Sequence, residues 1–227
     1  MAITTDPHDQ GRVVEAVAGH HETREQRHFK ERLAVWLFIS GDAVFLLMEL
    51  FYWFYLRALN TDGMWRGVAC TKANPCTDGL GNPITHEIAK STPWWTVSIA
   101  ILVVLAAGLI WGVERATQRQ AARSAVAGTA ALGLAVVVAA IVVQCLQFGQ
   151  LPFTTIDGTY ASTFEFFMGS TLAHLGLLAF IVLGLWSRAK RGRYDGGHWY
   201  QVRIIRIFAV WLATSTAILA IVMIAFS

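Results

Sequence analysis

Five apolar stretches, each long enough to cross a bilayer, constrain this chain more than any other feature of its sequence. They cover roughly residues 34–58, 94–113, 125–147, 160–186 and 204–226. A membrane-spanning helix needs about 20 mainly apolar residues, and only helices or closed barrels satisfy the backbone in lipid. Continuous runs such as Ser98–Ile110 and Ala131–Val143 lack the alternation of a barrel strand. The pattern predicts an all-α, integral membrane five-helix bundle over residues 34–227, preceded by a polar tail, residues 1–33.

The distribution of basic residues predicts the orientation of this bundle. With the N-terminus in the cytoplasm, all but four of the 18 Lys and Arg residues lie on the cytoplasmic side; the exceptions are Arg57, Arg66, Lys72 and Lys90. The positive-inside rule therefore predicts a cytoplasmic N-terminus and a periplasmic or extracellular C-terminus. Lipid headgroups account for the basic loops without a nucleic-acid partner. The first 30 residues lack the apolar core of a cleavable signal peptide, and we expect a multi-pass protein of a bacterial plasma membrane.

Four ionisable side chains lie at membrane depth, where charge is costly and function is the first explanation to test. Asp42 and Glu49 are on the first stretch, and Glu165 and His174 are on the fourth. A carboxyl group at the depth of Asp42 must be protonated or paired. It therefore suits either a proton relay or a protonated carboxyl bonded to a neighbouring helix. Glu49 follows Asp42 by seven residues, so the two share a helix face.

Glu49 and Glu165 both fall in the outer halves of their helices and could meet, together with Gln147. Two carboxylates at one site would share a proton or hold a cation, and a metal site here would need a further ligand. His174 follows Glu165 by nine residues and lies on the opposite helix face, which favours a structural hydrogen bond for His174. No ligand pattern for heme or copper is present, so we expect this chain to bind neither.

Cys70 and Cys76 share the loop Gly63–Pro93 on the predicted outer face. On an oxidising face, two cysteines in one short loop can form a disulfide that closes a tight turn. The alternative is a metal site, which would need more ligands than this pair supplies. Cys145, within the third stretch, is interpreted as a small apolar side chain.

Three short motifs lie on the first, third and fourth stretches. They are W-L-F-I-S-G-D-A-V-F at residues 36–45, Q-C-L-Q-F at 144–148 and D-G-T-Y-A-S-T-F at 157–164. In order and spacing they resemble W-L-F-L-A-S-E-V-x-F, Q-x-x-E-Y and D-G-x-Y-G-S-T-F of subunit III of the heme–copper terminal oxidases, the cytochrome c and quinol oxidases. The chain resembles a divergent member, because Thr171 replaces a family histidine and Glu49 and Glu165 stand where the family has uncharged residues.

This resemblance implies a non-catalytic accessory subunit of an oxidoreductase complex, a hetero-oligomer with oxidase subunits I and II. Heme and copper would be in those partner subunits, and phospholipid would bind this one. Asp42 would occupy the family's buried carboxyl site, which is linked to proton uptake and to protection of subunit I. Family-like packing and hydrogen-bonding positions would be Gln144, Gln147, Tyr160, Ser162, Gly169 and His174. Two alternatives stay open: an ion or metal site of the chain's own at Glu49 and Glu165, and a purely structural assembly subunit.

Overall fold

The computed structural model describes residues 24–59, 65, 76–77, 80–84, 91–194 and 199–226. Its elements are α2 (Arg24–Leu59), β1 (Cys76–Thr77), β2 (Pro83–Ile84), α3 (Pro93–Gln118), α4 (Arg123–Gly149), α5 (Thr159–Lys190) and α6 (Tyr200–Ala225). Five helices in this part of the chain are long and apolar enough to cross a membrane. This confirms the predicted all-α, five-helix bundle, whereas its orientation stays a prediction.

The helices extend past most ends of the apolar stretches. The largest difference is in α2, which begins at Arg24 rather than at residue 34. Residues 24–33 are therefore helical and continuous with the first apolar stretch. Residues 1–23 lie outside the described residues. Charged and amide side chains of this segment are good helix formers, and Glu25 in the first turn complements the helix dipole. At α3, Pro93 stands at the first helical turn, where its missing N–H costs nothing.

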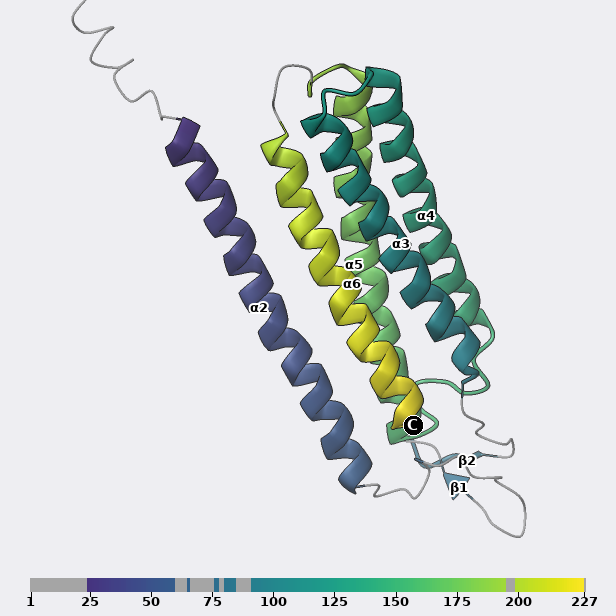
Figure 1. Ribbon diagram of the computed structural model, residues 1–227. Coiled ribbons are helices and arrows are strands. Elements are labelled where there is room, and N and C mark those ends of the chain that lie inside the picture. The colour runs from purple at the N-terminus through teal and green to yellow at the C-terminus, as the bar shows by residue number, and fades with distance from the viewer. Residues whose placement is uncertain are drawn as a thin grey trace, which may run out of the picture.

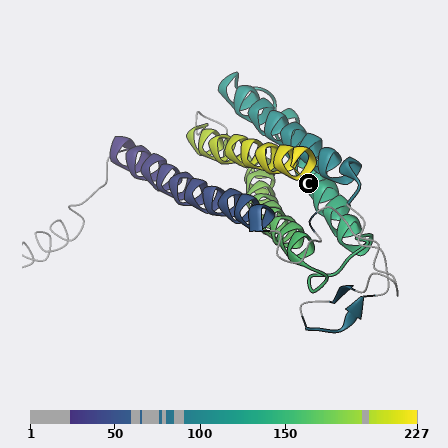
Figure 2. The ribbon, with the colours of Figure 1, turned by 90° about the horizontal axis from the view of Figure 1, so that it is seen from below.

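Helices α3, α4, α5 and α6 pack together, and α2 lies to one side of them, alongside α5 and α6 (Figure 1; Figure 2). Small residues allow α3 and α4 to approach closely: a Cβ added at Gly133 would lie 3.7 Å from the Cβ of Leu109. Only 17% of the most apolar window of α2 is buried, against 56% for α6. Most of the apolar surface of α2 therefore faces outwards, to lipid or to a partner.

An aromatic cluster joins the C-terminal end of α2 to the start of α5. Trp53 is fully buried, and its ring centroid lies 5.0 Å from that of Trp65, 5.1 Å from that of Phe167 and 6.0 Å from that of Tyr160. Such edge-to-face and tilted arrangements stabilise aromatic pairs beyond their buried area. Tyr160 is thus a core packing residue.

The segment between α2 and α3 contains a two-stranded antiparallel ladder in which Cys76 faces Ile84. Cys76 is disulfide-bonded, and the predicted partner Cys70 lies outside the described residues. Cys145 on α4 is a free cysteine. The ladder lies at the end of the bundle where α2 and α6 finish and α3 and α5 begin (Figure 1).

Candidate functional site

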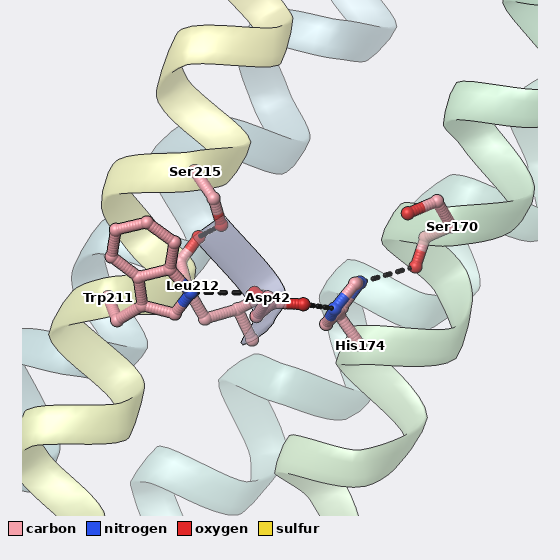
Figure 3. A network of polar contacts seen from close by, with 6 residues as sticks. All are labelled: Asp42, Ser170, His174, Trp211, Leu212 and Ser215. Carbon is pink, nitrogen blue, oxygen red and sulfur yellow. Dashed lines mark hydrogen bonds and ion pairs between the residues drawn. The ribbon is translucent and has the colours of Figure 1, made fainter. Parts of the chain in front are cut away.

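Asp42 joins three helices through hydrogen bonds from both of its carboxyl oxygens. Its Oδ1 lies 2.7 Å from Nε2 of His174 on α5, and its Oδ2 accepts a bond of 2.6 Å from the indole Nε1–H of Trp211 on α6. Figure 3 shows the carboxyl group between the two rings. We call Asp42, His174 and Trp211 the central cluster. Each residue lies near the middle of its helix, at the depth where an unpaired charge is most costly.

The hydrogen bonds of His174 determine how many protons the central cluster holds. Nδ1 lies 2.8 Å from the backbone oxygen of Ser170, and because a carbonyl oxygen only accepts, Nδ1 must carry a proton. One further proton then lies between Nε2 and Asp42. The pair is either a neutral imidazole with a protonated carboxyl group or an imidazolium with a carboxylate, and its net charge is zero in both cases. The pairing explains how an acid is accommodated at this depth.

Glu49 lies two helical turns beyond Asp42 on the same side of α2, as the spacing predicts. It is 2% exposed, and its Oε1 makes no hydrogen bond of good geometry among the described residues, although the Ser170 side chain is its polar neighbour. The same holds for the hydroxyl oxygen of Ser170. Glu49 and Ser170 line a small cavity that also borders Asp42 and His174. A buried polar atom without a partner is rare in folded proteins and calls for a functional explanation.

Glu165 shares a second, larger hollow with Glu49. The two acids line a groove of about 620 Å³ between α2 and α5, the α2–α5 groove, whose other lining residues are Phe45, Met48, Tyr52, Thr155, Ser162 and Phe166. The carboxyl group of Glu165 accepts a hydrogen bond from the hydroxyl of Thr155. The structure thus brings Glu49 and Glu165 to one groove, as the sequence suggested.

Gln147 does not join these two acids. Its Nε2 donates a bond of 3.3 Å to Oγ1 of Thr96 on α3, and its Oε1 accepts one of 3.3 Å from Gln144. Both glutamines are buried and connect α3 to α4, which fits the expected hydrogen-bonding role. Within the described part of the chain, no group of three His, Cys, Asp or Glu side chains could hold a metal ion. Among the described residues, Glu49 and Glu165 thus have no third His, Cys, Asp or Glu beside them to complete a metal site.

Two further predicted positions are less constrained than expected. The hydroxyl of Ser162 donates to the backbone oxygen of Thr159 at 3.1 Å, within its own helix. Gly169 is exposed, and a Cβ there would meet no atom within 4 Å. Gly169 therefore makes no close helix contact with the part of the chain that the structure describes.

Among the polar contacts between helices that sequence reasoning missed, two bear on the site and its support. The first is Trp211 as a partner of Asp42; a lone Trp in the middle of an apolar stretch, where its N–H needs an acceptor, is the signal that could have found it. The second is an ion pair at the opposite end of the bundle from the ladder, in which Nε of Arg206 lies 2.8 Å from Oε2 of Glu114 without the alignment of a hydrogen bond. The signal was that Glu114 follows the end of the second apolar stretch and Arg206 lies near the start of the fifth, both on the predicted cytoplasmic side.

Neither a protein-family model nor a curated protein matches this sequence. The interpretation of the site therefore depends on its geometry, and membership of the oxidase subunit III family stays a prediction.

Proposed function

We propose that this chain is an accessory, subunit III-like component of a respiratory heme–copper oxidase complex, in which the Asp42–His174 pair exchanges protons within the membrane. The observation that carries the proposal is the distance of 2.7 Å between Nε2 of His174 and Oδ1 of Asp42, which places one shared proton between them. Such a pair can give up one proton and take one back, which a relay requires.

The surroundings of the pair support exchange rather than permanent isolation. The side chain of His174 is 20% exposed and that of Asp42 is 10% exposed, so neither is sealed in the core. The Trp211 donor holds the other carboxyl oxygen and stabilises the carboxylate when the shared proton leaves. In the proposed complex, heme and copper belong to partner subunits I and II, and phospholipid covers the outward faces.

Co-purification from native membranes tests this proposal. The tagged full-length chain should bring with it a subunit with the visible spectrum of heme. In Asp42→Asn, the same complex should assemble with normal heme content, but proton-linked turnover should fall and inactivation should be faster. Thr214→Ala, which alters an exposed hydroxyl on α6, serves as the matched control. Isolation of a stable wild-type complex without any heme subunit would contradict the proposal.

A structural assembly role is a second candidate, because Asp42 ties α2 to α5 and α6 whether or not its proton moves. Asparagine can accept from Trp211 and donate to Nε2 of neutral His174, so it preserves both bonds. An assembly role alone therefore predicts unchanged turnover and inactivation in Asp42→Asn.

An ion site of the chain's own is a third candidate, favoured by the shared α2–α5 groove of Glu49 and Glu165. Elemental analysis of the purified protein tests it. A metal that survives purification and is lost in both Glu49→Gln and Glu165→Gln would favour this candidate over the oxidase proposal.

A further inference from the structure

We propose that Glu49 is a proton-exchange site between the α2–α5 groove and the central cluster, so that protons reach the Asp42–His174 pair from the end of the bundle where α5 begins. This is the predicted outer end. The inference deepens the proposed function, on which it rests for the role of the pair, but its site, Glu49, is a different residue reached by a different route.

The position of Glu49 between two hollows is the first argument. It lines both the α2–α5 groove and the small cavity beside Asp42 and His174, and Phe45 is the other residue common to both linings. A proton on Glu49 can therefore be exchanged on either side by rotation of one side chain. A carboxyl group buried only for packing would not need contact with both hollows.

The unsatisfied oxygen of Glu49 is the second argument. Oε1 of Glu49 and Oγ of Ser170 are buried neighbours that make no hydrogen bond of good geometry among the described residues. The small cavity has a volume of about 10 Å³, close to the smallest that admits one water molecule, about 10–15 Å³. Thr171, Ser215 and Thr216 also line it. The hydroxyls of Thr171 and Ser215 donate to carbonyl oxygens of their own helices, so toward a water they would act as acceptors. A water at this position would have the two to four polar partners that ordered water requires.

The distance between the acids requires such an intermediate. Seven residues along α2 separate Asp42 from Glu49 by about 10 Å at 1.5 Å per residue, too far for direct transfer. Ser170 lies one turn before His174 on α5, and its backbone oxygen already accepts from Nδ1 of that ring. A chain from Glu49 through the Ser170 hydroxyl and one water therefore reaches the pair.

The proton balance is as follows. A proton from water in the groove binds the Glu49 carboxylate and gives a neutral carboxyl group. When the Asp42–His174 pair has released its shared proton and carries one negative charge, Glu49 passes its proton across the small cavity. The pair is neutral again, and Glu49 is again a carboxylate ready to take the next proton from the groove.

The charged and titratable groups around Glu49 are few. Asp42 and Tyr52 face it from its own helix, and Glu165 and His174 face it from α5; α6 contributes only hydroxyl and apolar side chains to the two hollows. Glu165 is half-buried at the groove and bonded to Thr155. It can collect protons at the entrance, because a carboxylate at a groove mouth raises the local proton concentration.

Infrared spectroscopy of the full-length protein in phosphatidylcholine bilayers tests the inference. The readout is the difference between the spectra of wild type and Glu49→Gln in the region of the C=O stretch of protonated carboxyl groups. Bands of any co-purifying subunit cancel in this difference. After transfer to D₂O, the shift of this band reports how fast water reaches Glu49. Met48 and Leu47 are both 64% exposed neighbours on α2, but Met48 alone of the two lines the groove. They provide a blocking variant and its matched control.

We expect Met48→Trp to slow exchange of the Glu49 band about tenfold and Leu47→Trp to leave it unchanged. Asp42→Asn should leave the band and its exchange in place, because the proton enters from the groove. The inference is overturned if Glu49→Gln removes no band at any pH, or if Asp42→Asn slows exchange while Met48→Trp does not. Failure to find a heme partner would refute the proposed function but would not alter these spectra, so the two failures are distinguishable.

Discussion

Replacing Asp42 by asparagine and by leucine separates the hydrogen bonds of the central cluster from its proton. Asparagine has nearly the shape of aspartate, accepts from the Trp211 N–H and donates to Nε2 of neutral His174. Leucine removes both bonds and leaves the indole N–H and the imidazole nitrogen without partners. The two variants therefore differ in the contacts that hold α2 to α5 and α6, which are 2.7 and 2.6 Å long in the native chain.

The magnitude follows from interhelical hydrogen bonds in membrane proteins, which contribute on average about 0.6 and at most about 1.7 kcal/mol each. Two lost bonds should lower the free energy of unfolding by about 1–3 kcal/mol in Asp42→Leu. Asp42→Asn should change it by less than about 1 kcal/mol, because a shape-preserving replacement that keeps both partners satisfied costs little.

The assay is equilibrium unfolding in mixed micelles, followed by circular dichroism of the helices. Combining each variant with Trp211→Phe gives a double-mutant cycle that isolates the Asp42–Trp211 bond. A loss in Asp42→Asn as large as that in Asp42→Leu would refute the reasoning, because it would mean that an ionic attraction, and not the two hydrogen bonds, holds the cluster together.

Three further predictions concern other parts of the molecule. Glu114→Gln should lower the free energy of unfolding by about 1–2 kcal/mol, which is less than the loss of a fully buried ion pair would cost, because the Arg206 side chain is 26% exposed. Adding Arg206→Gln should restore most of this loss in the same unfolding assay. No restoration would contradict the pairing. Burial raises the pKa of Tyr194 above its ordinary value, and nearby Arg188 only partly offsets this. The contribution of neutral Tyr194 to the free energy of unfolding should therefore be fully present below about pH 10 and be lost as the pH rises further. Tyr194→Phe should show a flatter dependence of stability on pH, and parallel curves for the two proteins would exclude this cause. Gly133→Ala should be tolerated, because the added Cβ would make an ordinary contact at 3.7 Å. Gly133→Leu should lower the free energy of unfolding by about 1–3 kcal/mol, because the larger side chain overpacks the contact. Equal thermal midpoints for the two variants would show that α3 and α4 are not closely packed there.

The sequence predicted the helices well because hydrophobic length in lipid leaves few alternatives. Hydropathy located the apolar part of the first helix but not its polar beginning at residues 24–33, because hydropathy does not report a polar extension of a helix. The spacing of Asp42 and Glu49 correctly placed them on one side of α2, because helical periodicity is local information. Which side of α2 faces α5 and α6 is tertiary information that periodicity does not contain.

The site was only partly predictable for the same reason. Glu49 and Glu165 were expected to approach each other from their depths alone, and they do line one groove. Gln147 has a similar depth, but it lies on α4 and bonds to Thr96 of α3, so depth could not assign it to the correct neighbour. The bond between His174 and Asp42 joins residues 132 positions apart, and nothing in the local sequence of either residue specifies the other.

The long separation between Asp42 and its partners has a consequence for biosynthesis. His174 follows Asp42 by 132 residues and Trp211 follows it by 169, so at synthesis rates of about 5–20 residues per second the first helix waits roughly 10–30 s for its last partner. During that interval Asp42 is in the insertion machinery or in lipid without either ring, where an aspartate at the helix centre disfavours insertion by about 2.5–3.5 kcal/mol. The rest of the helix is apolar enough to offset this. The first helix can therefore enter the membrane early, but the hydrogen bonds of Asp42 to both rings form only after the fifth helix has left the ribosome.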